Sequence, residues 1–350
     1  MLDFLKKTFF NPYPRLDWIQ IDISSYCGAE CIYCPHTAYQ KNWANRFLDD
    51  TIYELLRPAF QKTRLVYLQG WGEPLTHPNF FKFLDLAKRS GVMVGTTTNG
   101  MLITQQSADQ IVDKGLDILC FSLAGIDKKN DAIRKGAPLK KVLHAIEKIH
   151  RAKNKYKTDR PGIHIAFMLL RSGLNDLEKL PGFVSETGAN QTVVSSLSLV
   201  THKDLIKESM LVESEKEWPE LRQRFLDIRS QAASRGTDIH FHIVAPFAKR
   251  TNCSENSSRA LVIGSDGSVS PCVMKNLPVN GEIDYYFNNQ KITYQPLIFG
   301  NIRRDPLNLI WNSPSYRSFR KKSLRYPPDS CTKCCKQFID PINPADSYWV

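Results

Sequence analysis

The spacing of its nine cysteines is the feature that most constrains this 350-residue chain. Cys27, Cys31 and Cys34 form a C-x3-C-x2-C motif near the start, and five further cysteines lie in the last hundred residues. The count is odd, and the first residues mix charges with apolar side chains, so neither a secretory signal nor a disulfide framework is expected. The clustered cysteines are therefore expected to be thiolate ligands, and the protein is expected to be cytoplasmic.

The composition is that of a globular protein, with 42% apolar and 23% charged residues. No run of about 18 apolar residues occurs, so no membrane span is expected. The formal net charge of +12 fits either a basic surface or an anionic substrate and cofactors. Nucleic acid would need further signals, and we expect it to be an unlikely partner.

Three thiolates this close in sequence can hold a metal or a cluster that keeps one coordination position open. A structural zinc ion would need a fourth ligand, which His36 could supply, and the motif alone leaves that alternative open. Three cysteine ligands on an iron–sulfur cluster would instead leave one iron free for a substrate or cofactor.

The motif follows a β-rich stretch at residues 18–24, and Tyr33 precedes its last cysteine. This arrangement resembles the radical S-adenosylmethionine (SAM) superfamily. The resemblance implies that the three cysteines hold a 4Fe-4S cluster whose open iron binds the amino and carboxylate groups of SAM, with Tyr33 beside the cofactor. It also implies that the reduced cluster cleaves SAM to a 5′-deoxyadenosyl radical, which abstracts a substrate hydrogen.

Strand-like and helix-like segments alternate along the middle of the chain. Strands are expected at 18–24, 64–70, 93–100, 117–125, 162–170 and 191–200, and helices at 48–60, 79–90, 104–114, 138–153, 174–187 and 214–235. The alternation predicts an α/β fold with a parallel sheet, and six units match the partial (β/α)6 TIM-like barrel of radical SAM enzymes.

A small C-terminal extension, made of a β-hairpin and helices, is expected to follow the barrel. The expected organisation is an N-terminal extension at 1–17, the barrel at 18–236 and the extension at 237–350. Residues 237–246 are expected to be a strand that leaves the barrel.

Two polar motifs end the second and third expected strands, where the active sites of such folds gather. GWGEP resembles the family's GGEP motif, which implies that Gly72, Glu73 and Pro74 receive the SAM amino group, although Trp71 replaces the usual small residue. TTTNG places Asn99 near the SAM ribose by the same resemblance. Both motifs can also be read as plain turns.

FSLAG and IRKG resemble the family's S-L-D-G and I-R-G pattern, with Ala124 in place of the usual Asp. This implies that Ser122 and Arg134 contact the SAM carboxylate and ribose, and the planar fork of an arginine suits a carboxylate. A surface arginine is the plainer interpretation of Arg134. Cys120, on the apolar strand, is expected to pack in the core.

The late cysteines resemble the SPASM extension or its shortened form, Twitch. The resemblance rests on a hairpin with G-x4-C ending at Cys272, on the GNI and IWNSP segments, and on the final C-x2-C. It implies an auxiliary 4Fe-4S cluster on Cys253, Cys272, Cys331 and Cys334, and the count of five cysteines favours Twitch. Cys335 could replace Cys334, because adjacent residues of an extended segment point in opposite directions. A zinc ion on four thiolates is the alternative.

A fully ligated auxiliary cluster implies a role in accepting an electron from a substrate radical. The resemblance therefore favours a dehydrogenase-like radical SAM oxidoreductase in cofactor or natural-product biosynthesis. Its expected partners are a small, anionic molecule as substrate and flavodoxin or ferredoxin as electron donor. Such an oxidation requires a general base, which the sequence does not identify. His164, His240 and His242 are expected to be ordinary half-buried histidines.

The main alternative is a maturase that cross-links or epimerises a ribosomal peptide. Many such enzymes carry a peptide-recognition domain before the barrel, whereas only 26 residues precede Cys27 here. A GTP cyclase of molybdenum-cofactor type is less favoured, because the late cysteines are spaced differently. An RNA-modifying protein rests only on the basic and aromatic stretch at 315–326, which also matches a helix of the extension.

Overall fold

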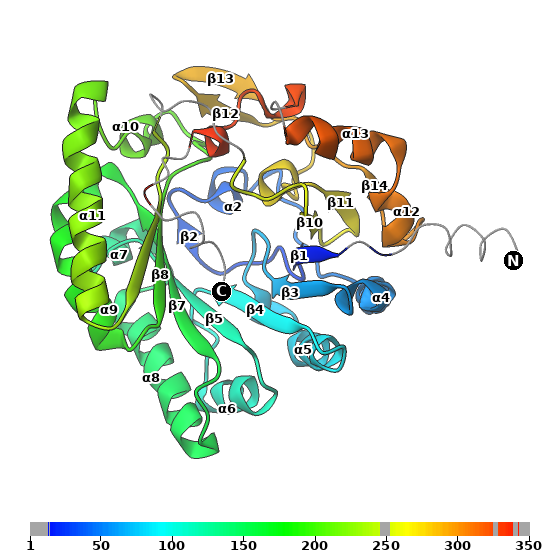
Figure 1. Ribbon diagram of the computed structural model, residues 1–350, viewed down its shortest axis with the longest axis horizontal. Coiled ribbons are helices and arrows are strands. Elements are labelled where there is room, and N and C mark those ends of the chain that lie inside the picture. The colour runs from blue at the N-terminus through cyan, green and yellow to red at the C-terminus, as the bar shows by residue number, and fades with distance from the viewer. Residues whose placement is uncertain (1–12, 14, 246–252, 325–327, 339–341, 343–350) are drawn as a thin grey trace, which may run out of the picture.

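A curved sheet of ten strands runs through the computed structural model, which describes residues 13, 15–245, 253–324, 328–338 and 342. Across the sheet the strands are β14 (Gly300–Asn301), β11 (Ser268–Ser270), β10 (Ala260–Ile263), β1 (Leu16–Ile21), β3 (Thr63–Leu68), β4 (Met93–Thr98), β5 (Ile118–Leu123), β7 (Gly162–Leu169), β8 (Gln191–Ser196) and β9 (Asp238–His242). From β10 to β9 every neighbouring pair is parallel, whereas β11 and β14 are antiparallel. The sheet curves without closing, so the expected partial barrel is confirmed (Figure 1).

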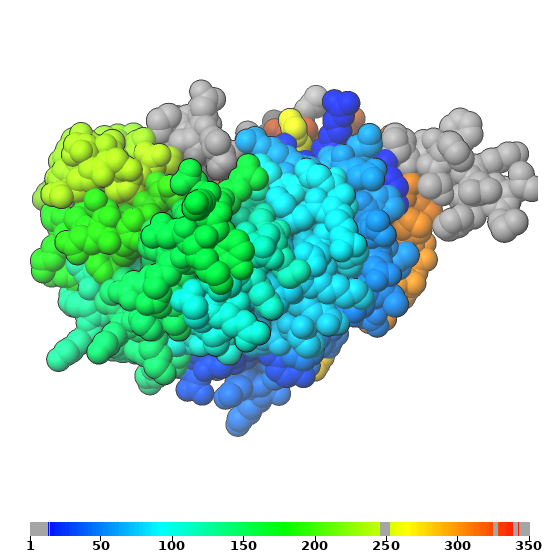
Figure 2. Space-filling view, turned by 90° about the horizontal axis from the view of Figure 1, so that it is seen from below, coloured from blue at the N-terminus to red at the C-terminus, as the bar shows by residue number. Residues whose placement is uncertain are grey.

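Helices cover the outer side of the sheet, and Figure 2 shows residues of this blue-to-green part of the chain forming most of one face. The helices of this layer are α3 (Asp50–Leu55), α4 (Arg57–Phe60), α5 (Phe80–Lys88), α6 (Gln105–Asp113), α8 (Leu139–Tyr156), α9 (Leu180–Thr187) and α11 (Trp218–Ser234). Helix α8 buries Val142, Ala145, Ile146 and Ile149, the spacing of one helical face. No helix in the described ranges is both long and apolar enough to cross a membrane.

The strands present a different face to the inside of the curve. In β7, Ile163 and Ile165 are fully buried toward the helices, whereas His164 and Ala166 are only half-buried. Successive side chains of a strand point to opposite faces, so the half-buried set lines the concave side. The strand ends on this side position the site described below.

The strand expected to leave the barrel stays in the sheet. Strand β9 pairs in parallel with β8, with Ile239 opposite Thr192. Phe241 of β9 stacks on Phe225 of α11 at 4.5 Å between ring centroids. Its apolar side is thus covered by the preceding helix, as in the other βα units, and the expectation was wrong.

The C-terminal part adds to the same sheet and then folds over the concave side (Figure 1). The predicted hairpin is confirmed as β10 and β11, and β10 also pairs in parallel with β1. The remaining elements are η4 (Val273–Lys275), β12 (Asp284–Phe287), β13 (Gln290–Thr293), α12 (Leu307–Trp311), α13 (Pro314–Ser323), η5 (Asp329–Cys331) and η6 (Cys335–Gln337). An apolar cluster holds this part to the barrel, formed by Trp43, Leu199, Leu277, Ile283 and Tyr294 with half-buried Tyr39, Trp71, Met274, Val279 and Tyr285.

Candidate functional site

The three early cysteines lie together on the loop that leaves β1. Within that loop, β2 (Glu30–Cys31) pairs antiparallel with β6 (Arg134–Lys135), so that Cys31 lies opposite Arg134. The amide of Cys34 donates to the carbonyl of Cys31 at 3.0 Å, and Cys34 then begins the short helix α2 (Pro35–Ala38). Cys27, Cys31 and Cys34 share one apolar cluster with Ala29. The structure thus brings together all three residues of the motif.

These thiols are set up for a cationic partner. Burial raises the pKa of Cys27 to about 11 and that of Cys34 to about 12, and the neighbouring thiols add to both shifts. Packed thiolates without a counter-charge are unfavourable, and a bound metal centre supplies that charge. In the described part of the chain, no three Cys, His, Asp or Glu side chains converge as closely as a single metal ion requires. Three thiolates fit an iron–sulfur cluster because soft sulfur ligands are the donors that such clusters use.

Glu73 holds the ends of two strands together from a buried position. Its carboxylate accepts the hydroxyl of Thr98 at 2.8 Å, the amide of Asn99 at 2.7 Å and the amide of Leu75 at 3.2 Å. Burial raises the pKa of Glu73, and these donors oppose the rise. The amide of Glu73 in turn donates to the carbonyl of Tyr26 at 2.7 Å, beside the first cysteine.

Arg134 is 5% exposed and lies among the thiols. Its Nη1 donates to the hydroxyl of Tyr33 at 2.5 Å, while its Nε has no partner in the described residues. Burial alone would lower the pKa of Arg134, but the charges of Tyr33, Cys31 and Cys27 raise it. A buried guanidinium with a free donor fits an anionic ligand. The plainer interpretation, a surface arginine, is wrong.

The other predicted residues lie at the same ends of the strands. The amide group of Asn99 donates to the Sγ of Cys27 at 3.8 Å, which places it against a predicted cluster ligand. Ser122 is half-buried on β5, one strand further along the sheet. Gly72 packs so closely on the chain after β1 that a Cβ there would lie 2.2 Å from the carbonyl oxygen of Ser24. Pro74 is buried at the start of η1 (Pro74–Thr76).

Four of the late cysteines also gather. Cys272 lies within electrostatic range of Cys253, Cys331 and Cys334, and burial raises its pKa well above the usual value. Burial raises the pKa of Cys253 to about 12 as well. These are the four residues predicted to hold the auxiliary cluster, and they fit one for the same reason as the early group.

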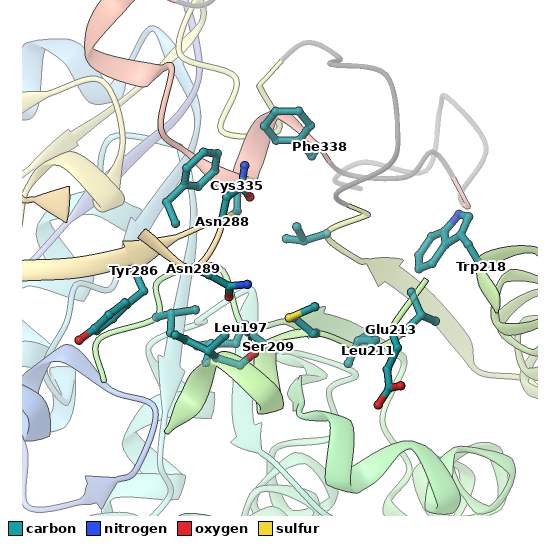
Figure 3. Close-up of a pocket in the computed structure, with 16 residues that line it drawn as sticks. Leu197, Ser209, Leu211, Glu213, Trp218, Tyr286, Asn288, Asn289, Cys335 and Phe338 are labelled. Carbon is teal, nitrogen blue, oxygen red and sulfur yellow. Dashed lines mark hydrogen bonds between the residues drawn. The ribbon is translucent and has the colours of Figure 1, made fainter. Parts of the chain in front are cut away.

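Cys335, the alternative fourth ligand, lies within electrostatic range of Cys334. It lines a cavity of about 300 Å³ between the ends of the barrel strands and the β12–β13 hairpin. In Figure 3 Asn289, at the hairpin turn, faces Leu197 and Ser209 across this cavity. The geometry therefore favours Cys334 over Cys335 as the ligand.

A half-buried ion pair lies beside the late cysteines. The Nζ of Lys336 is 3.1 Å from the Oε1 of Glu255, and each side chain is 18% exposed. Besides burial, the negative charge of Glu255 raises the pKa of the Cys253 and Cys334 thiols, and the positive charge of Lys336 interacts favourably with their thiolates. Sequence reasoning missed this pair, although each residue follows a predicted ligand by two positions.

The remaining sequence expectations fall outside these two groups. His164 and His240 lie within electrostatic range of each other, and burial lowers the pKa of His164 to about 4. Cys120 is buried beside Tyr67, as expected of a core residue. In the basic stretch, Arg320 stacks on the ring of Trp311 at 3.8 Å, so one of its cations serves the fold.

Comparison with known proteins agrees with this geometry. The family model described as the radical SAM superfamily matches residues 21–178, and the one for the SPASM iron-sulfur cluster-binding domain matches 253–335. The chain is therefore a radical SAM enzyme with a C-terminal SPASM domain. Its cofactors are a SAM-binding 4Fe-4S cluster, an auxiliary cluster and SAM. The boundaries of the three segments and the shortened Twitch form stay predictions.

The similar proteins have diverse reactions. A tungsten-containing aldehyde ferredoxin oxidoreductase cofactor-modifying protein from Pyrococcus furiosus is 25% identical over 91% of this chain and 87% of its own. An AdoMet-dependent heme synthase from Methanosarcina barkeri is 23% identical over 92% and 87%. The solved structure of anSMEcpe with bound AdoMet and Cp18Cys peptide superposes with a TM-score of 0.62 at 19% identity over 92% and 87%, which shows a shared fold.

Proposed function

We propose that this enzyme oxidises a small molecule, passing the electron of the substrate radical to the auxiliary cluster in the biosynthesis of a cofactor or natural product. The observation that carries the proposal is the second group of cysteines. Four thiols gather there, and Lys336 and Glu255 neutralise each other beside them. A cluster ligated by all four thiols would have no open position for a substrate, so electron transfer is the role that fits it.

At the first site, we assign Cys27, Cys31 and Cys34 to the SAM-binding cluster. Arg134 offers its free guanidinium donor to the SAM carboxylate, and the backbone at Gly72 to Pro74 together with Glu73 receives the amino group. Asn99 and Ser122 extend the site toward the ribose, and Tyr33 orients Arg134 through their hydrogen bond. The cofactor bound there supplies the radical that removes a substrate hydrogen.

The substrate is proposed to lie between the concave face of the sheet and the C-terminal part. The net charge of +12 favours an anionic molecule, and relatives named for tungsten-cofactor modification and heme synthesis favour a cofactor precursor. Flavodoxin or ferredoxin is the proposed electron donor. A peptide substrate is the second candidate, because a solved structure with the same fold holds a peptide.

The test is iron and sulfide content after anaerobic reconstitution, in the wild type and in the Cys27/Cys31/Cys34→Ala variant. We expect about eight irons in the wild type and about four in the variant, with reductive SAM cleavage lost in the variant. About four irons in the wild type and none in the variant would refute the auxiliary cluster. Substrate screening then looks for a product that has lost two hydrogens, and a redox-neutral product would refute the oxidation.

A further inference from the structure

Trp71 connects the proposed SAM loop to the auxiliary site. Its indole Nε1 donates to the carbonyl oxygen of Val273 at 3.1 Å, and Val273 directly follows Cys272. The ring also packs in the apolar cluster that holds the C-terminal part to the barrel, with Leu277 and Tyr294 among its members. Sequence analysis marked Trp71 as a departure from the family motif, and no step of the proposed function uses it.

The backbone on both sides of Trp71 is held against the chain that follows β1. A Cβ at Gly70 would lie 1.9 Å from the Oδ1 of Asp22, and one at Gly72 would lie 2.2 Å from the oxygen of Ser24. The loop therefore approaches this chain as closely as only glycine permits. We therefore expect a displacement of the Trp71 side chain to move the backbone of Gly72 and Glu73, the residues proposed to receive the SAM amino group.

The Val273 carbonyl that accepts the indole hydrogen bond belongs to a turn that begins at Cys272. The hydroxyl of Ser270 and the amide of Lys275 both donate to the carbonyl of Cys272, each at 3.2 Å. Val273 lies inside this turn, at the start of η4. Its carbonyl also accepts the amide of Asn276 at 3.1 Å, so it moves with the turn that begins at Cys272. Ligation of the four thiols would set where that turn lies.

We propose that Trp71 is a positioning residue that couples filling of the auxiliary cysteine site to SAM binding at the other site. With the auxiliary cluster in place, the Val273 carbonyl holds the indole and the GWGEP loop keeps the geometry that receives SAM. Without it, the carbonyl shifts and the loop loosens. This inference rests on the proposed assignment of the two sites.

The experiment is a double-mutant cycle on SAM affinity, measured by calorimetry on anaerobically reconstituted protein. The variants are Cys253→Ala, which removes an auxiliary ligand away from Val273, Trp71→Phe, which keeps a ring but loses the donor, and the two combined. Each single variant is expected to weaken SAM binding about threefold to tenfold, the range of one hydrogen bond. The double variant should bind no more weakly than Trp71→Phe. Effects that multiply, or no effect of Trp71→Phe, would overturn the coupling.

Trp43→Phe is the matched control. Trp43 belongs to the same apolar cluster, but its indole donates to the carbonyl of Ser25 at 2.9 Å, within the barrel. Any effect of this variant should multiply with that of Cys253→Ala, because no hydrogen bond of its ring crosses to the auxiliary site.

Hydrogen exchange gives a second measurement that does not depend on affinity. The amide of Glu73, bonded to Tyr26, should exchange faster in Cys253→Ala than in the wild type, and equally fast in Trp71→Phe with or without the auxiliary cluster. Unchanged protection in both variants would contradict the coupling even if one of them bound SAM poorly. Failure of the wild type to bind SAM, or to hold iron at the late cysteines, would instead refute the proposed function.

Discussion

The two cysteine sites each have a positive and a negative side chain, but the two charges are paired at only one of the sites. Each has one cation and one carboxylate beside its thiols, buried at the early site and half-buried at the late site. At the early site Arg134 bonds to Tyr33, and Glu73 bonds to a hydroxyl and backbone amides, so the two charges are held apart. At the late site Lys336 and Glu255 bond directly to each other at 3.1 Å.

The difference shows which site is built to receive a ligand. Separated charges, with a guanidinium donor left free, match a zwitterion that carries both a carboxylate and an ammonium group. Charges that neutralise each other leave no free charge for an ionic ligand, and at the late site both charges are engaged in that one pair. We therefore propose that the early site is open to a ligand and the late site is closed, although both contain buried thiols.

The largest expected effect separates the two sites by their cysteines. Cys34→Ala should abolish reductive SAM cleavage, whereas Cys334→Ala, assayed at saturating SAM, should retain cleavage and lower product formation at least about a hundredfold, because the electron acceptor is lost. Liquid chromatography of 5′-deoxyadenosine and product measures both. Cys335→Ala is the neighbouring control and should keep the full iron content. Equal loss of cleavage in Cys34→Ala and Cys334→Ala would remove the distinction between the sites.

Arg134→Gln sharpens the comparison at the open site. Losing a buried cation that binds a carboxylate should weaken SAM binding by about 30-fold or more. Arg134→Lys should recover only part of the affinity, because lysine keeps the positive charge but lacks the two parallel donors of the guanidinium. Calorimetric titration with SAM checks both, and Lys336→Gln should leave this affinity unchanged. A loss of less than about threefold in Arg134→Gln would mean that the arginine serves only the fold.

Lys336→Met tests the closed site. Removing the cation leaves Glu255 as an uncompensated negative charge, which disfavours adding an electron to the auxiliary cluster. The reduction potential of that cluster should fall by on the order of 50–100 mV, from the Coulomb energy of one charge at an effective dielectric of about 20. A redox titration followed by EPR measures it. Glu255→Gln should shift the potential upward, and shifts of the same sign in both variants would contradict the electrostatic account.

Local patterns predicted most of the barrel, because short apolar runs with period two and helical faces are encoded within each segment. The pairing of β10 with β1 could not be predicted, since Ala260 and Trp18 meet only through the fold. The three-cysteine site was predictable because its ligands lie within eight residues. The link from Trp71 to Val273 joins positions 202 apart, and nothing in the neighbouring sequence marks it.

The smallest expected effect concerns a histidine on the concave face of the sheet and the pH dependence of stability. His164 on β7 belongs to neither charged group, and burial, with the nearby His240, lowers its pKa to about 4. In the unfolded chain its pKa is about 6.5, so between these values the unfolded state binds a proton that the folded state does not. Stability contributed by neutral His164 is therefore full above about pH 6.5 and falls as the pH drops, by up to about 2 kcal/mol at pH 5.

His164→Gln should remove that part of the acid sensitivity while keeping a polar side chain on the concave face. The measurement is the melting temperature of wild type and variant, both with full iron content, at pH 8 and pH 5. The wild type should lose more between the two values than the variant does, because the clusters contribute equally to both proteins. An equal loss of melting temperature would show that His164 stays accessible to protons in the folded protein. The concave face of the sheet would then be open to solvent rather than enclosed by the C-terminal part.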